Sequence, residues 1–405
     1  MSQDPVVIVE ALRTPIGAFQ GKLNRISAPE LGAITVRAIT DLTKIDPVQI
    51  TEVMMGCVLT AGLGQAPARQ VVRKAGLSDY VGATTINKVC GSGMKAVMLA
   101  HDQIVCSEDD VLIAGGMENM SRTPHLLLDA RGEKNKLDEA AVTPKNVTDH
   151  LFLDGLEDAY QKGASMGLLA EQTADTHHIT RKDQDAFAKE SLRRAQDAQK
   201  NEKFQREMIP ITLGTPAGEV NIDADECVEK AKPEKIDTLK PAFKEEGTIT
   251  AATASSIADG AAALLLMRAS KAKALGLPIR AKILAHAHHA QSPDTFAIAP
   301  IEAIQKVVKK AHWTLKNVDL FEINEAFAVV PLAVMKALGL SHEKVNIHGG
   351  ACAMGHPIGA SGARILVTLL NALEQTEKKR GVAAVCIGGG EATAVAIELV
   401  TPAFA

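Results

Sequence analysis

The most restrictive feature of this sequence is a pattern that occurs twice, once in each half. Residues 92–97 (SGMKAV) resemble residues 361–366 (SGARIL), and each copy leads into an apolar run that ends in glycines and a glutamate, at 113–118 and at 386–391. The order is the same in both copies and the spacing is nearly the same. Self-similarity of this kind predicts a chain built from two duplicated halves, whose loops would meet at a shared site.

Short β-branched runs alternate with Ala-rich segments of helical period over most of the 405 residues, which is typical of α/β layers. Strands are expected at residues 6–9, 52–58, 111–114, 281–286, 320–323 and 383–387. Between about 121 and 250 the sequence becomes richer in charge, with an exposed helix expected at 181–203 and a Lys/Glu-rich loop at 226–240. This stretch is predicted to be an inserted lobe.

The change of character also predicts the domain organisation. The N-terminal half comprises residues 1–120 and is completed by residues 251–274. The inserted lobe comprises residues 121–250, and the C-terminal half comprises residues 275–405. A chain of this length can bury more than one core.

Composition and charge argue against two classes of partner. The formal net charge is −4 and aromatic residues make up 3%, so neither a basic field nor stacking platforms favour nucleic acid. No apolar run reaches the roughly 18 residues that a membrane span needs. The six cysteines lack a CxxC spacing, which favours free thiols in a reducing compartment. The run 6–9 follows the first residues directly and 401–405 carry no recognised targeting signal, so a cytoplasmic protein is expected.

Cys90 lies in the stretch 87–96 (NKVCGSGMKA), between an apolar run and a segment of helical period. A cysteine at the start of a helix lies near unpaired N–H groups and the positive end of the helix dipole, which favour the thiolate and lower the thiol pKa. Its glycine neighbours allow a substrate to approach the backbone closely. The context indicates a nucleophile, and the alternative is a buried cysteine that acts only as a small hydrophobe.

His356 lies among small residues in the stretch 346–364 (NIHGGACAMGHPIGASGAR). Pro357 disfavours helical geometry at His356, so the imidazole is expected on a loop just before a helix, where a catalytic base can be displayed. The alternative is a histidine that is satisfied locally by backbone groups. Cys352, four residues earlier, is expected to be a packing residue.

An expected strand that includes Cys386 runs into three glycines, 388–390. A nucleotide-binding loop is disfavoured, because Thr393 stands at the last glycine position of the GxGxxG pattern. Consecutive glycine N–H groups at a strand end suggest an oxyanion hole instead. At the end of an earlier strand, Asn324 is a candidate hydrogen-bond donor and Glu325 a candidate orienting group. The alternative for this pair is a simple helix cap.

Three histidines raise the question of a metal site: His286, His288 and His289. His286 and His288 share one face of an expected strand. No Cys, Asp or Glu lies near them in the sequence, so no metal site is expected.

The four blocks described above resemble, in order and spacing, those of the thiolase family: the blocks of Cys90, Asn324, His356 and Cys386. The resemblance covers essentially the whole chain and includes two further stretches, 13–17 (RTPIG) and 254–262 (ASSIADGAA). It implies an α/β fold with two duplicated βαβαβαββ halves, which form a layered α/β/α/β/α core with an inserted loop domain. The active site would lie at the junction of the halves.

The resemblance also implies a role for each candidate residue. Cys90 is the nucleophile that accepts the acyl group, and His356 is the base that activates it. Cys386 moves the proton at the α-carbon of the second acyl-CoA. Asn324 stabilises the enolate oxygen through a water, alongside His356. The backbone N–H groups of Cys90 and Gly388 hold the oxygen of the acyl-enzyme.

The implied reaction is a ping-pong condensation of two acetyl-CoA to acetoacetyl-CoA and CoA, with neither a metal nor a redox cofactor. Ser255 is expected to contact the pantetheine and Phe327 to line the pocket. Ser165 and Met166 stand where short-chain thiolases carry His-Met, and Glu391 stands where the family commonly has Met. These departures leave the chemistry intact. They keep open a 3-ketoacyl-CoA thiolase of broader chain length, acting in β-oxidation, as the alternative.

The partners implied are acyl-CoA and CoA, together with further copies of the chain in a dimer or a dimer of dimers. The phosphate end of CoA would lie on the inserted lobe, where the Lys-rich stretch 230–240 could screen its charge. Decarboxylating condensing enzymes of related fold are disfavoured by Cys386 in its glycine turn. A non-catalytic binding protein is disfavoured because Cys90 and His356 are both present.

Overall fold

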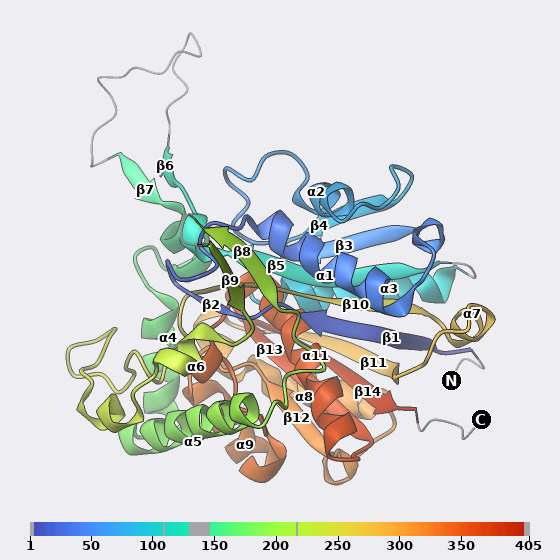
Figure 1. Ribbon diagram of the computed structural model, residues 1–405. Helices are drawn as coiled ribbons and strands as arrows, with labels where there is room; N and C mark the ends of the chain where they lie inside the picture. Colours follow the sequence, from blue (N-terminus) through green and yellow to red (C-terminus); the bar gives the residue numbers. More distant parts are fainter. Residues whose placement is uncertain (1–3, 108–109, 129–145, 216–217, 401–405) are drawn as a thin grey trace.

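The computed structural model describes residues 4–107, 110–128, 146–215 and 218–400 (Figure 1). Its centre is a long mixed sheet in the order β12-β13-β14-β11-β1-β10-β5-β3-β4. The strands of the N-terminal half are β1 (Val6–Arg13), β3 (Glu52–Gly56), β4 (Gly82–Ile86), β5 (Leu112–Asn119) and β10 (Ala258–Arg268), and the two-residue β2 (Gly17–Ala18) pairs with β10. Those of the C-terminal half are β11 (Ala281–Ala290), β12 (Leu320–Ile323), β13 (Arg380–Ile387) and β14 (Glu391–Leu399). Every strand expected from the sequence is present, and several are longer than expected.

The duplication predicted from the sequence repeat is present in the strand order. The order β3-β5-β10-β1 in the N-terminal half recurs as β12-β13-β14-β11 in the C-terminal half. In each copy the first two strands are parallel and the other pairs are antiparallel. The two sheets join through only two residue pairs of β1 and β11, Val7 with Lys282 and Ile8 with Ala281.

The two copies differ at one strand. β4 pairs with β3 along its whole length, whereas the matching place in the C-terminal half holds a single bridge between Phe321 and Val345. The next residue, Asn346, has a φ of 49°. Its side-chain amide donates to the carbonyl of Ile323 and accepts the N–H of the same residue, both at 2.8 Å. A side chain thus takes the place of the backbone ladder.

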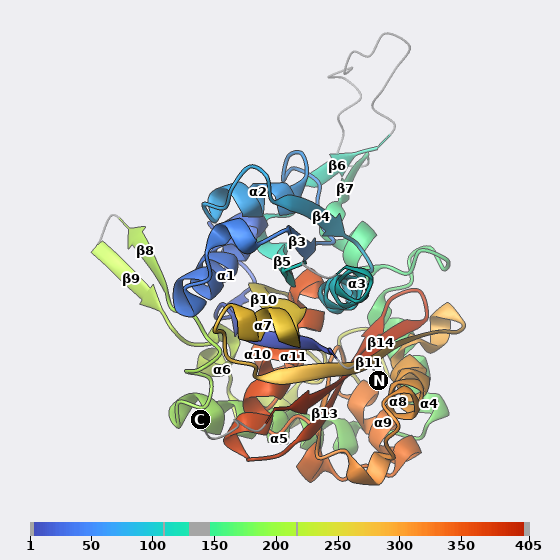
Figure 2. The same ribbon diagram turned by 90° about the vertical axis from the view of Figure 1, so that its right-hand side faces the viewer.

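Helices cover the outer faces of the sheets and fill the space between them (Figure 2). The outer helices of the N-terminal half are α1 and α2, and α8 packs on the C-terminal sheet with α9 beside it. Between the sheets, α3 and α11 pack against each other and against strands of both halves. The result is the predicted α/β/α/β/α layering. The bounds are α1 (Ala28–Thr43), α2 (Pro67–Lys74), α3 (Ser92–Cys106), α7 (Ala269–Ala274), α8 (Ala299–Lys310), α9 (Val329–Leu338), α10 (Ala351–Met354) and α11 (Ile358–Gln375), with short helical turns η1 (Pro47–Gln49), η2 (Met120–Arg122), η6 (Pro293–Ile298), η7 (Leu315–Asn317) and η8 (His342–Lys344).

The glycines of the sequence repeat lie where the two middle helices cross. A Cβ atom on Gly362 would lie 2.5 Å from the backbone nitrogen of Met94. A Cβ atom on Gly93 would lie 2.9 Å from the carbonyl oxygen of Gly359. Because backbone atoms stand in both places, no larger residue fits without moving a helix. The repeat therefore sets how closely the two halves approach.

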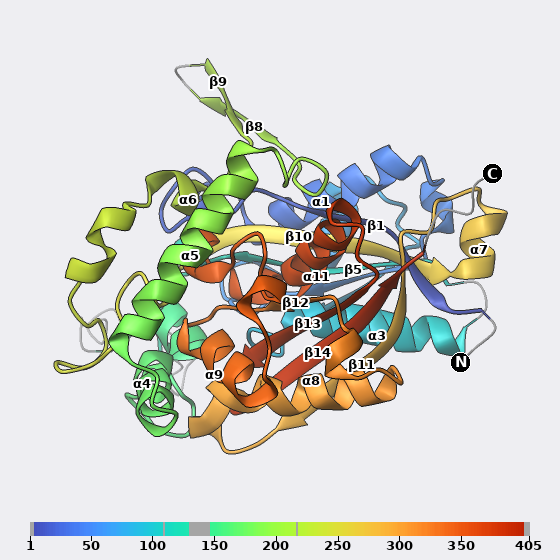
Figure 3. The same cartoon turned by 90° about the horizontal axis from the view of Figure 1, so that it is seen from below.

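The inserted lobe lies along one side of the two halves and is drawn in green and yellow-green (Figures 1 and 3). The expected helix at 181–203 is α5 (Arg181–Lys200), which buries one face rather than being simply exposed. The prediction of a loop at 226–240 is wrong. Two short helices form there, because Val228 and Ile236 are buried in a cluster with Ile16. The lobe contains β6 (His125–Leu127), β7 (Val147–Asp149), η4 (Phe152–Leu156), α4 (Met166–Thr176), α5, β8 (Ile211–Thr215), β9 (Gly218–Ile222), α6 (Glu226–Lys230) and η5 (Pro233–Thr238).

Arg13 anchors the lobe to the N-terminal half. Its fully buried guanidinium donates to the Glu207 carboxylate at 2.6 Å and to both oxygens of Asp225 at 2.8 and 3.0 Å. Asp225 also accepts the N–H of Ile16 at 2.8 Å. The Arg-Thr-Pro-Ile-Gly stretch therefore acts as a docking segment for the lobe.

The predicted domain ranges stay a prediction. Parts of these ranges lie outside the described residues: 1–3, 108–109, 129–145, 216–217 and 401–405. The expectation of no targeting signal at 401–405 lies outside them as well. Across the described part of the chain, no helix combines the length and the apolar character needed to cross a membrane.

Candidate active site

A cavity of about 760 Å³ lies where the two halves meet the inserted lobe. The N-terminal half contributes Cys90, and the C-terminal half contributes His356 and Gly388. The lobe contributes most of the remaining wall, including residues 152–160. A site at this junction is what the duplication and the inserted lobe predicted.

Cys90 stands directly before the first turn of α3, and it lines the cavity. Ser92 holds the loop around it, because its hydroxyl accepts the N–H of Lys88 at 2.8 Å and donates to the carbonyl of Val89 at 2.6 Å. Val89 has a φ of 45°, which is a strained conformation for a β-branched residue. The strained turn presents the thiol at the helix start, as the sequence predicted.

The protonation of Cys90 differs from the expectation. Burial raises the pKa of the thiol to about 11, although an N–H of Gly388 that bonds to the sulfur opposes this rise. The expected lowering by the helix terminus is therefore wrong for the free protein, because loss of solvent outweighs the favourable N–H groups. Cys90 is a thiol at neutral pH and needs a base to become a nucleophile.

His356 is the candidate for such a base. It is buried, and its backbone N–H donates to the carbonyl of Ser256 at 2.9 Å. Its Nδ1 lies 2.5 Å from the hydroxyl oxygen of Ser361, and that hydroxyl donates its own proton to the carbonyl of Pro357 at 2.9 Å. Ser361 must therefore accept from Nδ1–H, which leaves Nε2 as the unprotonated nitrogen. Burial, with the nearby Arg364 charge, lowers the pKa of His356 to about 3, so the ring is neutral.

Asn324 lies on the Nε2 side of His356, with its amide nitrogen 3.4 Å from that atom. Its backbone N–H donates to the carbonyl of Ala384 at 2.9 Å, which fixes the residue at the end of β12. The side-chain oxygen of Asn324 is buried without a hydrogen-bond partner in the described part of the protein. Buried polar atoms of this kind are normally satisfied by a water. This supports the expected water between Asn324 and His356.

Cys386 is near the end of β13 and is almost fully buried. Burial raises the pKa of its thiol well above the usual range, and the neighbouring Cys90 adds to the rise. The glycine turn that follows has positive φ values at Gly389 and Gly390, and a Cβ on Gly390 would lie 2.4 Å from the carbonyl of Gln291. Neither Cys386 nor Asn324 is among the residues that line the cavity, but Cys386 lies next to Cys90 and Asn324 next to His356, which both line it.

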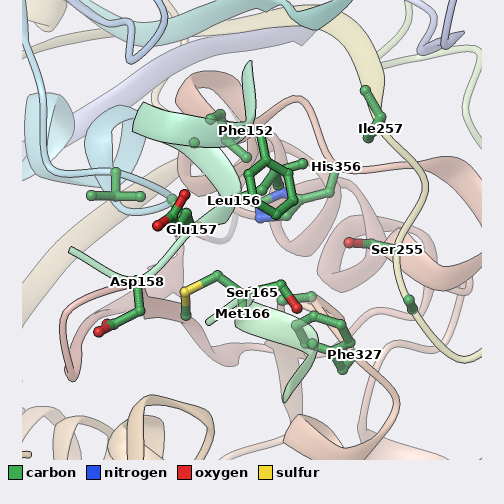
Figure 4. A pocket seen from close by; sticks show the side chains of 18 of the residues that line it. Phe152, Leu156, Glu157, Asp158, Ser165, Met166, Ser255, Ile257, Phe327 and His356 are labelled. Atoms are coloured by element: carbon green, nitrogen blue, oxygen red, sulfur yellow. The ribbon is translucent and has the colours of Figure 1, made fainter. Parts of the chain in front are cut away.

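The four expected substrate-contact residues all line the cavity: Ser165, Met166, Ser255 and Phe327. Figure 4 shows Ser165, Met166 and Phe327 grouped together, with His356 across the cavity from them. Ser255 is placed by its backbone N–H, which donates to the carbonyl of Ala326 at 2.9 Å. Ser165 caps α4, because its hydroxyl accepts the N–H of Leu168 at 3.4 Å. The Lys-rich stretch 230–240 contributes no residue to the cavity wall.

Two aromatic rings contact Phe327 and were not expected from the sequence. Phe243 of the lobe lies edge-on to it, with ring centroids 5.8 Å apart, and Phe296 does the same at 6.3 Å. All three rings line the cavity. They come from three separate parts of the chain, so no local pattern could have grouped them.

Glu325 does not face the candidate catalytic groups. Its carboxylate accepts from Ser191 at 2.7 Å, from the amide of Asn346 at 2.8 Å and from the N–H of Cys352 at 3.1 Å. It thereby ties the lobe helix α5 to the loop that precedes His356. Cys352 packs against backbone carbonyls, as expected.

Glu118 is a functional candidate that the sequence marked only as part of the repeat. Its buried carboxylate accepts the N–H groups of Val58, Leu59 and Gly359 at 3.0, 3.2 and 2.9 Å. Burial raises its pKa to about 7. The residue fastens the first turn of α11 to the N-terminal half, and so holds the loop of His356 in place.

Two family models match the chain, "Thiolase, N-terminal domain" over residues 6–270 and "Thiolase, C-terminal domain" over residues 277–399. Among curated proteins, acetyl-CoA acetyltransferase of Cupriavidus necator is 46% identical over 395 residues, which covers 97% of this chain and 99% of that protein. Acetyl-CoA acetyltransferase 1 of Arabidopsis thaliana is 46% identical over 400 residues, which covers 98% and 94%.

Solved structures show the same fold over nearly the full length. The Acat5 thiolase of Ascaris suum, in complex with coenzyme A, matches with a TM-score of 0.89 and 38% identity, covering 98% of this chain and 100% of that one. The acetyl-CoA acetyltransferase of Bacillus anthracis matches with a TM-score of 0.91 and 36% identity, covering 98% and 99%. With both domain models and these relatives in agreement on the architecture predicted above, the chain belongs to the thiolase family.

Proposed function

We propose that this protein is an acetyl-CoA acetyltransferase, which condenses two acetyl-CoA to acetoacetyl-CoA and CoA in a reversible ping-pong reaction. The observation that carries the proposal is the thiol of Cys90, which lines the same cavity as neutral His356 and accepts an N–H from Gly388. The names of the relatives above and the coenzyme A bound to one of them support the choice of substrate.

In the first half-reaction, Cys90 gives its proton to Nε2 of His356 and attacks the thioester carbonyl of acetyl-CoA. The C–S bond to CoA then breaks, and Cys386 supplies the proton that the departing CoA sulfur needs. The products are acetyl-Cys90, free CoA, a protonated His356 and a Cys386 thiolate.

In the second half-reaction, the Cys386 thiolate removes a proton from the α-carbon of a second acetyl-CoA. The raised pKa of Cys386 suits this step, because a more basic thiolate is better matched to a weakly acidic C–H. The enolate carbon attacks the acetyl carbonyl, and the bond to Cys90 breaks. Cys90 regains its proton from His356, so all groups return to their starting forms.

Two sets of donors would stabilise the negative oxygens that form on the way. The N–H of Gly388 points at the Cys90 sulfur and would serve the tetrahedral adduct there, together with the N–H of Cys90. A water held by the orphan oxygen of Asn324, alongside His356, would serve the enolate oxygen. Thiol, imidazole, amide and backbone groups carry every step, so the proposal includes no metal or redox cofactor.

The aromatic wall favours a short acyl group over the broader chain lengths of a 3-ketoacyl-CoA thiolase. Phe243, Phe296 and Phe327 pack edge to face on the cavity wall, and we infer that these rings limit the length of the acyl chain there. We further propose a dimer or a dimer of dimers, on the family resemblance alone, and a cytoplasmic location, on the free cysteines.

The test is mass spectrometry of the intact protein and its peptides after mixing with acetyl-CoA. One acetyl group is expected on the peptide that contains Cys90, and none in a Cys90→Ala variant. Acetylation that persists in Cys90→Ala, or a folded wild type that accepts no acetyl group, would remove Cys90 from this role. The second half-reaction is tested by adding fresh acetyl-CoA to the isolated acetyl-enzyme, which should give acetoacetyl-CoA in the wild type and none in Cys386→Ala.

A further inference from the structure

The contact between α3 and β11 brings His286 next to two consecutive residues of α3, His101 and Asp102. His286 Nε2 of β11 lies 2.7 Å from Oδ1 of Asp102 on α3, and Nδ1 of the adjacent His101 lies 3.1 Å from the same oxygen. The two imidazole rings are edge to face, with centroids 5.1 Å apart. The sequence argued against a metal at His286 because no Cys, Asp or Glu lies near it in the sequence, and the fold supplies an Asp from 184 positions away.

We infer that His101, Asp102 and His286 form a binding site for one divalent transition metal ion of the Zn²⁺ type. One donor atom from each residue lies within 4.8 Å of the other two. Zn²⁺ bonds to imidazole nitrogen and carboxylate oxygen are about 2.0 to 2.2 Å long, which in tetrahedral geometry separates the donors by about 3.4 Å. The observed contacts of 2.7 and 3.1 Å are shorter than this separation, so the donors must move apart slightly when the ion replaces the proton between them.

The charge states of the cluster suit a metal. Burial lowers the pKa of His286 despite the opposing effect of Asp102, so the imidazole is neutral near pH 7, and a metal ion would replace the single proton that Nε2 shares with Asp102. Burial disfavours the charged form of Asp102, but hydrogen bonds with both histidines outweigh it, and its pKa lies below the usual range. The cluster offers one carboxylate oxygen and two imidazole nitrogens, a donor set that Zn²⁺ prefers over Ca²⁺ or Mg²⁺.

The surroundings leave a position for solvent and supply one opposing charge. The Asp102 side chain is 53% exposed, while His101 and His286 are each 17% exposed, so water can complete the coordination. The ammonium of Lys310 donates to the backbone carbonyl of His286 at 3.1 Å and weakens cation binding. The site is therefore expected to bind less tightly than a closed structural zinc site.

The position of the cluster gives the metal a structural role. α3 belongs to the N-terminal half and begins at Ser92, two residues after Cys90, and β11 is the strand of the C-terminal half that meets β1. His101 is eleven residues beyond Cys90, about 16 Å along the helix axis. A metal here would add a cross-link between the two halves, whose sheets join through only two residue pairs, and it would stay apart from the cavity chemistry.

The test is Zn²⁺ and Co²⁺ titration of the full chain after removal of metal. Thiolates also bind these ions, so each titration is repeated in a Cys90→Ser background, and Co²⁺ absorption separates sulfur ligation from nitrogen and oxygen ligation. Asp102→Asn and His286→Ala each remove one donor, and the first keeps the shape of an exposed side chain. His288→Ala is the matched control, because His288 is an exposed histidine two residues along the same strand face.

One ion per chain is expected in the wild type and in His288→Ala, with affinity at least about tenfold weaker in Asp102→Asn and His286→Ala. The urea midpoint should rise with added Zn²⁺ in the wild type but not in Asp102→Asn. Equal uptake by all four proteins would overturn the inference, and so would a wild type that takes up no ion with nitrogen and oxygen ligands.

Discussion

Lys88 and Glu391 form an ion pair between the two loops that carry the candidate catalytic groups. Lys88 is two residues before Cys90, and Glu391 directly follows the glycine turn of Gly388. The residues are 303 positions apart, and their side chains are 23% and 34% exposed. The carboxylate that stands in place of the usual methionine is therefore paired rather than free, and it joins the loop of Cys90 to the glycine turn of Gly388.

Breaking this pair should lower activity modestly without unfolding the protein. Partly exposed ion pairs contribute about 0 to 1 kcal/mol, so Lys88→Met and Glu391→Gln should each lower kcat/KM by up to about fivefold. Steady-state kinetics of both single variants and the double variant would measure the coupling. If Lys88 and Glu391 act through their ion pair, kcat/KM of the double variant should be no lower than that of either single variant. Fully additive losses of kcat/KM would show that the ion pair is not the cause.

Ser361→Ala should slow the reaction through His356. The variant leaves Nδ1–H without its acceptor, so the ring can rotate or change tautomer and Nε2 is no longer held as the base. We expect kcat to fall by about 10- to 100-fold with little change in KM, as for other groups that orient a functional imidazole.

Thr376→Ala is the matched control for Ser361→Ala. The hydroxyl of Thr376 donates to a carbonyl four residues back in the same way, at 2.7 Å, but it has no histidine partner. Thr376→Ala should keep its kcat. A similar kcat loss in both variants would mean that the effect comes from α11 and not from His356.

Arg13→Met should destabilise the protein strongly. The substitution leaves the carboxylates of Glu207 and Asp225 buried without their cation, and removing one partner of a buried ion pair costs about 3 to 5 kcal/mol. Urea unfolding should show this loss. Arg206→Met is the control, because Arg206 pairs with Glu10 at 2.8 Å but is 48% exposed, and the loss there should stay below about 1 kcal/mol. Equal losses would contradict the anchoring role of Arg13.

The sequence predicted the architecture because its determinants are local or repeated. Strand periodicity and the Gly93 and Gly362 repeat are enough to indicate two packed halves. The protonation of Cys90 was predicted wrongly, because the helix start is visible in the sequence whereas loss of solvent depends on the whole fold. Ser361 was visible only as a repeat of Ser92. In the structure the two serines hold the loops of Cys90 and His356 in matching ways.

Other parts of the site could not be predicted because their partners are distant in the chain. Phe243 and Phe296 meet Phe327 from the lobe and from the turn after β11. The short helices at 226–238 form because tertiary burial of Val228 and Ile236 overrides a charged, loop-like composition. The composition of this stretch indicates only that most of its side chains are exposed. The burial of two apolar side chains, Val228 and Ile236, determines its local structure.

His356 should make stability depend on pH. Its folded pKa of about 3 lies below the usual value of about 6.5, so between these values the unfolded chain binds more protons than the folded chain. The free energy of unfolding therefore falls as pH drops through this window. Between pH 6 and pH 4 the wild type should lose about 2 kcal/mol more than His356→Asn, which has no proton to bind. Urea unfolding at both pH values measures this difference, and parallel losses in the two proteins would contradict it.

Phe296→Ala should widen the range of acyl chains that the protein accepts. Phe296 is buried against Phe327 on the cavity wall, and the substitution removes a whole ring from a position that does not touch the candidate catalytic groups. Space for additional methylenes should then appear next to Phe327, and each buried methylene contributes about 0.8 kcal/mol, close to fourfold in affinity.

The measurement for Phe296→Ala is the ratio of kcat/KM for thiolysis of a six-carbon to a four-carbon 3-ketoacyl-CoA. Two further methylenes should raise this ratio by about tenfold or more over the wild type, mainly through the six-carbon substrate. Phe19→Ala is the control, because Phe19 also lines the cavity but is 45% exposed and lies outside the aromatic group around Phe327. A ratio that rises equally in both variants would place the acyl chain elsewhere in the cavity. A wild type that already favours the six-carbon substrate would instead support the broader 3-ketoacyl-CoA thiolase. In that case the three aromatic rings around Phe327 would not limit the length of the acyl chain.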